Sequence, residues 1–235
     1  MIVNLFSFYE LVPKNKTITW LYQKRSMEKV AVVTGSSSGI GFETSLALAR
    51  EGANVCFTYR KNQLEADLTT KMLVELGTDI MCFKCDSRDR KELRKVFKYV
   101  EKKWGMLDVL VNNAGVNKPT DFDNITDGDW DEILSTNLKG PFIVTQEAIS
   151  LLSLSGSASI VNIGSVSGQY GGPRTAHYAA SKAGLISLGQ VIARFGASKN
   201  IRCNTIAAGL IVSDMAGDSM KSPTVKKASE AILMK

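Results

Sequence analysis

Residues 30–41 read VAVVTGSSSGIG, an apolar, largely β-branched run followed by a glycine-rich turn. Such a run is typical of a strand buried on both faces, and apolar residues at helical spacing continue from Gly41 to Gly52. Glycines between a strand and a helix let the backbone approach a pyrophosphate closely, and the helix N-terminus adds N–H groups and a positive partial charge. Although the spacing is GxxxGxG rather than GxGxxG, this position predicts a nucleotide site.

Strand-like and helix-like segments alternate through the rest of the chain. The apolar runs predict strands at 30–34, 54–59, 80–84, 107–112, 159–163 and 202–206. The helical spacing predicts helices at 41–52, 63–76, 90–104, 130–150 and 176–195. Because parallel strands buried on both faces need helices between them, the expected fold class is α/β, a doubly wound parallel sheet of the Rossmann-like kind in a single domain.

The amino-terminal stretch 1–26 differs from the rest in composition. It mixes apolar and basic residues with one acid, Glu10, and it lacks the basic n-region and small-residue cleavage site of a secretory signal. We interpret it as an N-terminal extension of unknown role, with a natural start at Met27 and a dinucleotide-binding domain at 27–235.

Composition favours an ordinary globular protein with a small-molecule or carrier-bound partner. The 235 residues carry 29 basic and 23 acidic side chains, a net charge of +6 that suits an anionic dinucleotide or an acyl carrier. No apolar stretch reaches the roughly 18 residues of a membrane span. The basic residues of 90–104 are interpreted as the solvated face of a helix, so no nucleic-acid partner is expected. The apolar face of that helix is Leu93, Val96, Phe97, Val100 and Trp104.

Four cysteines are present, and two of them, Cys82 and Cys85, form a CxxC. Their spacing along a strand points the two side chains to opposite faces, and the chain has a single histidine. We therefore expect ordinary thiols, no metal site and a reducing, cytoplasmic location.

Two further motifs carry polar chemistry. Asn112-Asn113-Ala114-Gly115 closes the fourth strand, where small residues suit a ligand crevice but Asn side chains also stabilise ordinary turns. Tyr178 and Lys182 are four residues apart and share a helix face, so the ammonium is expected to lower the tyrosine pKa from about 10 toward neutrality. The alternative is a surface tyrosine lying along a lysine stem. His177 adjoins Tyr178 on another face and is expected to be a satisfied structural or surface residue.

In order and spacing, these segments resemble the short-chain dehydrogenase/reductase family over residues 28–216, and most closely its 3-oxoacyl-carrier-protein reductases. The motifs that carry the resemblance are TGSSSGIG at 34–41, Asp86, NNAG at 112–115, Asn137 in STNLKG, Ser165 and YAASK at 178–182. The resemblance implies an NAD(P)-dependent enzyme that transfers hydride between the nicotinamide and a carbonyl or alcohol. A sugar or simple alcohol substrate is the alternative within the family, and a non-catalytic dinucleotide sensor or subunit is the alternative outside it.

The resemblance also implies residue roles. Tyr178 would protonate the substrate oxygen, Ser165 would hold that oxygen, and Lys182 would bind the nicotinamide ribose. Asn137 would position a water for proton resupply. The residues implied in cofactor binding, besides Tyr178 and Lys182, are Gly35, Ser36, Ser38, Gly39, Ile40, Gly41, Arg60, Asp86, Asn113, Ala114, Gly115, Ile211 and Ser213.

The end of the second strand bears on the choice of cofactor. The second strand ends in Tyr59-Arg60 with no acid to bind ribose hydroxyls, and Arg60 suits a 2′-phosphate, so NADP(H) is expected over NAD(H). Ala208-Gly209 stands where the family usually has Pro-Gly, which relaxes the backbone there. The chain also ends before the family's last helix and strand. We therefore expect a sixth strand at an open sheet edge and a homo-oligomer in which a dimer is more secure than a tetramer.

Overall fold

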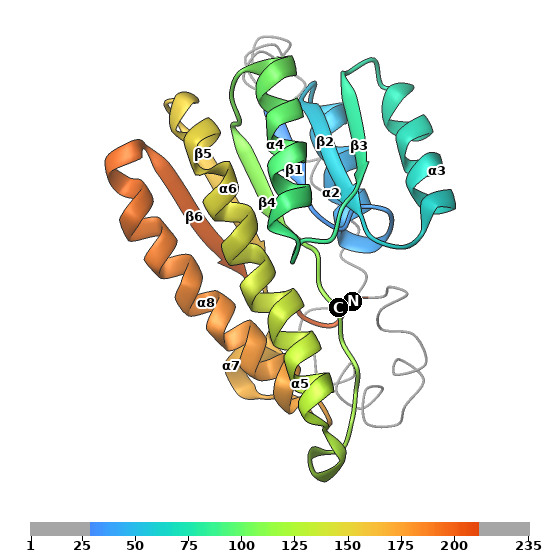
Figure 1. The fold of residues 1–235 in the computed structure, drawn as a ribbon, viewed down its shortest axis with the longest axis vertical. Coiled ribbons are helices and arrows are strands. Elements are labelled where there is room, and N and C mark those ends of the chain that lie inside the picture. Colours follow the sequence, from blue (N-terminus) through green and yellow to red (C-terminus); the bar gives the residue numbers. More distant parts are fainter. Residues whose placement is uncertain (1–28, 212–235) are drawn as a thin grey trace, which may run out of the picture.

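A computed structural model of the chain describes residues 29–211, and these form a six-stranded parallel sheet in the order β3-β2-β1-β4-β5-β6 (Figure 1). The strands are β1 (Val30–Val33), β2 (Asn54–Tyr59), β3 (Ile80–Lys84), β4 (Val109–Asn112), β5 (Ala158–Ile163) and β6 (Ile201–Ile206). The strand order reverses direction beside β1, as in a doubly wound sheet, and confirms the predicted fold class.

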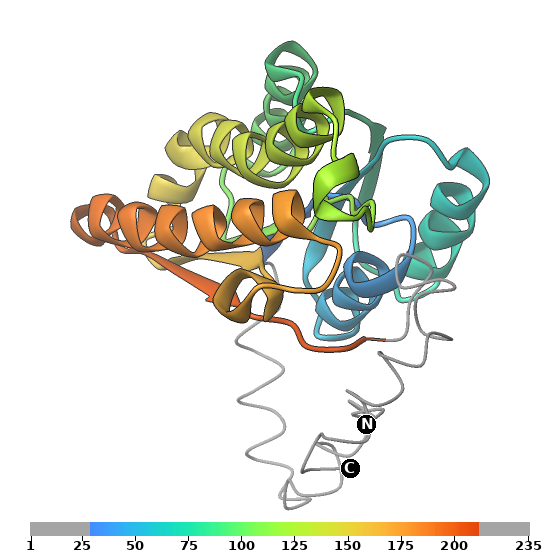
Figure 2. The same cartoon turned by 90° about the horizontal axis from the view of Figure 1, so that it is seen from below.

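Helices cover both faces of this sheet (Figure 2). They are α2 (Gly39–Arg50), α3 (Gln63–Val74), α4 (Arg90–Trp104), α5 (Asp127–Leu134), α6 (Gly140–Leu154), α7 (Ser167–Tyr170) and α8 (Ala176–Gly196). Three shorter turns, η2 (Phe122–Asn124), η3 (Ser135–Lys139) and η4 (Ala197–Lys199), complete the elements. Apart from the expected helix at 130–150, each predicted strand and helix is present with its ends within two residues of the prediction.

The core has two halves because successive strand residues point to opposite faces. Val32 belongs to the cluster under α4, α6 and α8, whereas Val33 belongs to the cluster under α2 and α3. In β4, Leu110 and Val111 divide in the same way. Every one of these side chains is almost fully buried, so the sheet excludes water on both faces along β1 and β4.

The helix predicted as continuous over 130–150 is divided into α5, the π-helical turn η3 and α6. Pro141, at the start of α6, has no backbone N–H, so the regular i→i−4 pattern cannot pass through it. The π turn absorbs an extra residue there. As a consequence Asn137, in the middle of η3, is fully buried rather than lying on a surface helix face.

Helix α4 buries the apolar face predicted for it, and Cys82 and Cys85 point to opposite faces of the sheet as predicted. Leu93, Val96, Phe97 and Val100 of α4 are buried, and Trp104 packs beside them. Cys82 lies in the cluster under α2 and α3 and Cys85 in the opposite one, both as free thiols. Within residues 29–211 no group of side chains is arranged to hold a metal ion. None of the helices in that range is long and apolar enough to cross a membrane.

Candidate active site

The glycine turn after β1 and the polar turn after β4 are bonded to each other at the carboxyl edge of the sheet. Thr34 Oγ1 accepts hydrogen bonds from the backbone N–H groups of Asn113 and Ala114, each 3.1 Å long. In return, Asn113 Nδ2 donates to the carbonyl oxygens of Thr34 at 2.9 Å and Gly35 at 2.7 Å. The two motifs that the sequence placed at separate strand ends therefore form one structural unit.

Two glycines in this unit are required by contact rather than by flexibility alone. A Cβ at Gly41 would lie 2.4 Å from both Asn113 Nδ2 and the Gly35 oxygen. A Cβ at Gly35, where φ is +65°, would lie 2.8 Å from Ala114 Cα. Because the Gly35 oxygen and Ala114 Cα are backbone atoms and Asn113 Nδ2 is held by two hydrogen bonds, any other residue would push the two turns apart.

The N-terminus of α2 faces this unit without a side-chain cap. Ser38 occupies the N-cap position with extended backbone but makes no capping hydrogen bond, whereas Asn62 caps α3 and Asp89 caps α4. The first N–H groups of a helix have no partner within the helix, and together with the dipole they favour an anion. The start of α2 therefore has the donors and the glycine backbone that a pyrophosphate needs.

Ser36, expected among the cofactor-binding residues, has a structural contact set instead. Its fully buried hydroxyl donates to the Gly41 carbonyl at 2.8 Å and lies 2.7 Å from Ser45 Oγ. Its backbone N–H donates to the Thr58 oxygen. Its side chain therefore ties the turn to α2 and is not directed at a ligand.

Charged residues gather where β2 and β3 end. Asp86, just beyond β3, is held by Arg88 through a 2.6 Å contact and three further hydrogen bonds. Its hydrogen bond with Arg88 lowers the pKa of Asp86, and the charge of Arg60 contributes to the same shift. Arg60, half-buried after β2, is therefore close enough to act on the Asp86 carboxylate.

Three candidate catalytic side chains come together from β5 and α8. Lys182 Nζ lies 5.6 Å from the centre of the Tyr178 ring and donates to the Ile163 carbonyl at 2.6 Å. Ser165 follows β5. Its hydrogen bond with Tyr178 acts to lower the tyrosine pKa, against the larger effect of burial. Ser165 and Lys182 are 8% and 4% exposed, so this chemistry would take place largely out of water.

Asn137 links the π turn to the turn after β4 and to α8. Its Oδ1 accepts from Val116 N–H at 2.8 Å, and its Nδ2 donates to the Val116 oxygen at 2.9 Å and to Ser181 Oγ at 3.2 Å. A Cβ at Gly115 would lie 3.3 Å from Asn137 Oδ1 and 3.7 Å from Lys182 Nζ, so the two side chains approach the same glycine. The fold thus places Asn137 beside Lys182, although 45 residues separate them.

The expected effect of Lys182 on Tyr178 is wrong. Burial raises the pKa of Tyr178 above its ordinary value, and only the Ser165 hydrogen bond acts in the opposite direction. Burial also lowers the pKa of Lys182 to about 8. The ammonium is directed at the Ile163 oxygen rather than at the phenol oxygen, and desolvation disfavours the charged form of both groups.

The remaining predicted residues lie outside this cluster. His177 is fully buried, so it is a structural residue, but neither ring nitrogen has a hydrogen-bond partner among residues 29–211. Ile211 is exposed at the end of the described chain, and Ser213 lies outside the described residues. Sequence reasoning gave no role to the Thr34 hydroxyl or to the Ile163 carbonyl, because both act through partners far away in the sequence.

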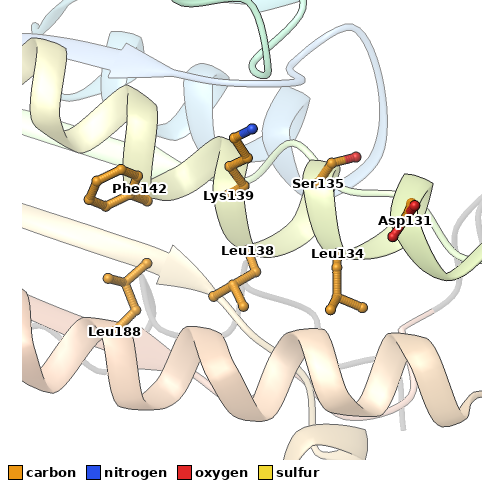
Figure 3. A pocket seen from close by; sticks show the side chains of 7 residues that line it. All are labelled: Asp131, Leu134, Ser135, Leu138, Lys139, Phe142 and Leu188. Carbon is orange, nitrogen blue, oxygen red and sulfur yellow. The ribbon is translucent and has the colours of Figure 1, made fainter.

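A separate hollow of about 560 Å³ lies between α5, η3 and α6 on one side and α8 on the other (Figure 3). Leu134, Leu138 and Leu188 point into the space between these helices, whereas Ser135 and Lys139 point away from α8. None of the candidate catalytic side chains lines it. Its largely apolar lining fits packing against another surface better than it fits acid–base chemistry.

Comparison with known proteins agrees with this geometry. The family described as short chain dehydrogenase matches residues 29–223. The 3-oxoacyl-(acyl-carrier-protein) reductase FabG of Staphylococcus aureus strain Mu50 is 39% identical over 189 residues, which is 80% of this chain and 77% of that protein. The reductase of the same name from Thermotoga maritima is 39% identical over 188 residues, covering 80% and 76% of the two chains.

Solved structures give the same result. A Sinorhizobium meliloti 1021 protein described as a short-chain alcohol dehydrogenase superposes with a TM-score of 0.80 at 32% identity, covering 86% of this chain and 80% of its own. A short chain dehydrogenase from Mycobacterium paratuberculosis bound to NAD has a TM-score of 0.80 at 27% identity, covering 88% and 80%.

Proposed function

Because this chain belongs to the short chain dehydrogenase family and is an NAD(P)-dependent oxidoreductase, we propose that it uses NADPH to reduce the 3-oxo group of an acyl thioester. The observation that carries the proposal is the meeting of Tyr178, Ser165 and Lys182, with Lys182 next to the turn after β4 that is bonded to the glycine turn before α2. An acid–base group and a dinucleotide-type turn at one edge of the sheet are what carbonyl reduction requires. The FabG relatives, named for 3-oxoacyl substrates, favour the thioester.

In the proposed reaction Tyr178 gives its hydroxyl proton to the carbonyl oxygen. The nicotinamide, when bound, supplies the hydride. A new C–H bond forms at the carbonyl carbon, the π electrons of the C=O bond take the tyrosine proton, and the ketone becomes a secondary alcohol. Ser165 holds the oxygen by a hydrogen bond. Lys182, whose pKa burial lowers to about 8, would meet the nicotinamide ribose beside the Tyr178 ring.

The cofactor would lie along the carboxyl edge of the sheet. The backbone from Gly35 to Gly41 and the start of α2 would hold the pyrophosphate, and Lys182 with Tyr178 would meet the nicotinamide ribose. The turn from Asn113 to Gly115 would border the other ribose, and Asp86 the adenine. Ile211 and Ser213 would touch the carboxamide.

NADPH is preferred in this proposal because Arg60 and Arg88 place two guanidinium groups where β2 and β3 end, and Arg60 makes no ion pair among those found in residues 29–211. Arg60→Ala should raise the Kd for NADPH by roughly 10- to 100-fold, as for a lost charged hydrogen bond of about 1.5–3 kcal/mol, and leave the Kd for NADH nearly unchanged. Lys61→Ala, the adjacent exposed lysine, is the matched control. Equal affinity of the parent protein for both cofactors would overturn the preference.

The substrate is tested by following NADPH and NADH oxidation with 3-oxoacyl thioesters, keto-sugars and simple ketones. The proposal expects the highest kcat/KM with a 3-oxoacyl thioester, free or carrier-bound. The second candidate is an alcohol or sugar dehydrogenase, favoured by the description of the Sinorhizobium neighbour. Tyr178→Phe serves as the blank in each assay, since it removes the proton and keeps the ring. If the parent binds cofactor but equals this blank on every substrate, a non-catalytic sensor replaces the proposal.

We also propose a cytoplasmic homo-oligomer, with a dimer as its smallest form, assembled through the hollow of Figure 3 and the adjoining outer faces of α6 and α8. Phe142, Val191 and Phe195 are 43%, 56% and 58% exposed there, which is unusual for large apolar side chains. Val191→Glu should convert the assembly to monomer in light-scattering measurements. A monomeric parent protein would contradict this assignment.

A further inference from the structure

Helix α3 buries three residues against the sheet but leaves several large apolar side chains exposed. Its buried positions are Ala66, Thr69 and Leu73. Away from these positions is an α3 stripe, defined here as Leu64, Leu68 and Met72 of the helix and Leu76 just beyond its end, which are 77%, 63%, 44% and 38% exposed. The four-residue spacing aligns these side chains on one side of the helix.

A surface helix usually exposes its polar face, whereas α3 exposes large apolar side chains in addition to burying Ala66 and Leu73. Helix α3 lies at the β3 edge of the sheet, and no other described helix or strand is drawn beyond it there (Figure 1). Contiguous apolar patches of a few hundred Å² on a protein surface mark a contact site. The exposure of the α3 stripe therefore raises the question of what covers it.

We propose that the apolar part of the chain's own amino-terminal extension, residues 1–12, covers the α3 stripe. That part contains seven large apolar residues, Ile2, Val3, Leu5, Phe6, Phe8, Leu11 and Val12. Residues 1–12 carry one charged side chain, Glu10, so the contact with the stripe is apolar. The charge complementarity lies in the connecting segment: residues 13–26 carry four basic residues and no acid, whereas α3 and its end carry Glu65, Asp67 and Glu75 against Lys71.

The point at which the extension enters the fold lies close to the end of α3. Lys29, the first described residue, accepts a hydrogen bond from Asn54 N–H at 2.8 Å, and Asn54 Oδ1 accepts one from Asp79 N–H at 3.0 Å. Asp79 follows α3 and precedes β3, so Lys29 is two strands from the carboxyl end of α3. Sixteen residues at up to ~3.3 Å each give a reach well beyond the ~18 Å length of the helix.

The size of the stripe favours a tethered occupant over a separate molecule. Four side chains offer a few hundred Å², whereas a stable interface buries about 800 Å² on each partner. A segment joined to the same chain binds at an effective concentration in the millimolar range, so a smaller contact suffices. A second copy of the chain or an unrelated protein would lack this advantage.

Photo-crosslinking in the full chain tests the contact directly. With Leu68 replaced by p-benzoylphenylalanine, we expect irradiation to give an adduct within one molecule, joining α3 to the tryptic peptide that ends at Lys14. The same photoreactive residue in place of Lys95, exposed on α4 on the other face of the sheet, should give no such adduct. Adducts that join two molecules, adducts to residues 212–235, or no adduct at all would overturn the proposal.

A second measurement separates a covered stripe from an exposed one. In the full chain, Leu64→Gln with Leu68→Gln should lower the melting temperature by roughly 4–8 °C, because polar groups would enter a buried contact. Val74→Gln, on the same helix but off the stripe, changes an apolar side chain that is 54% exposed and should leave the melting temperature nearly unchanged. If the double variant melts at or above the melting temperature of the parent, the stripe is exposed to solvent and the proposal is wrong.

Discussion

Lys182 is a buried cation, and replacing it should stabilise the fold while it abolishes turnover. Burial lowers its pKa from 10.5 to about 8. Each tenfold loss of proton affinity corresponds to about 1.4 kcal/mol, so keeping this amine protonated at pH 7 costs the folded state about 3 kcal/mol. Lys182→Met removes that cost, although it also removes the 2.6 Å hydrogen bond to Ile163, which is worth about 1–3 kcal/mol.

The pH dependence of this effect has a definite sign. Below pH 8 the lysine is charged in both the folded and the unfolded chain, so the cost is present in full. Between pH 8 and 10.5 the unfolded chain binds more protons than the folded one, and stability therefore rises with pH until the cost disappears. The free energy of unfolding of Lys182→Met minus that of the parent should accordingly fall by about 3 kcal/mol between pH 7 and pH 10.5.

Urea unfolding at a series of pH values measures this difference, because groups that titrate alike in both proteins cancel. Lys95→Met, which removes an exposed lysine of α4, is the control and should show no comparable change with pH. A difference between Lys182→Met and the parent that stays constant from pH 7 to 10.5 would refute the reasoning. It would mean that the amine is hydrated in the folded protein.

Three further predictions concern the site. Tyr178→Phe should reduce kcat by at least ~10²-fold, the usual contribution of a positioned acid, with cofactor Kd within a few-fold of the parent by fluorescence titration; turnover close to the parent's would identify another acid. Gly41→Ala should lower the free energy of unfolding by about 2–4 kcal/mol in urea titrations, because its Cβ would lie 2.4 Å from Asn113 Nδ2. Gly128→Ala is the control and should be nearly neutral, because the atom nearest to its Cβ would be 3.8 Å away. Asn137→Ala should increase hydrogen exchange at Val116, whose N–H it accepts at 2.8 Å, by at least tenfold, and unchanged exchange would show that the turn after β4 holds without it.

The position of Lys182 in the candidate active site accounts for the presence of a buried cation that lowers the stability of the fold. A charged lysine among buried groups is unfavourable for folding, but at the carboxyl edge it is positioned beside the one tyrosine of the cluster. Strained or costly groups concentrate at functional sites for this reason. The Ile163 carbonyl, supplied by the end of β5, accepts a hydrogen bond from the amine, which lies 5.6 Å from the centre of the Tyr178 ring.

Local pattern was enough for the sheet, for most helices and for the position of the nucleotide turn. Strand 30–33 and helix 90–104 each satisfy their own periodicity within a few residues, and tertiary contacts reinforce that choice rather than opposing it. The turn at 35–41 carries its own signal, because glycine alone tolerates its backbone and its close contacts.

Three features depend on residues distant in the sequence and could be seen only in the tertiary structure: the π turn, the direction of the Tyr178 pKa shift and the rotation of α3. The π turn buries Asn137 because Pro141 interrupts a helix that the apolar spacing predicts as continuous. The tyrosine pKa rises because desolvation outweighs a nearby ammonium, and desolvation is set by how all the surrounding elements pack. Likewise the outward direction of Leu64 and Leu68 follows from how α3 is rotated against the sheet, and composition does not reveal that rotation. Hydrophobic periodicity is a property of a short segment and can be seen in the sequence, whereas burial and charge environment are properties of the whole tertiary structure.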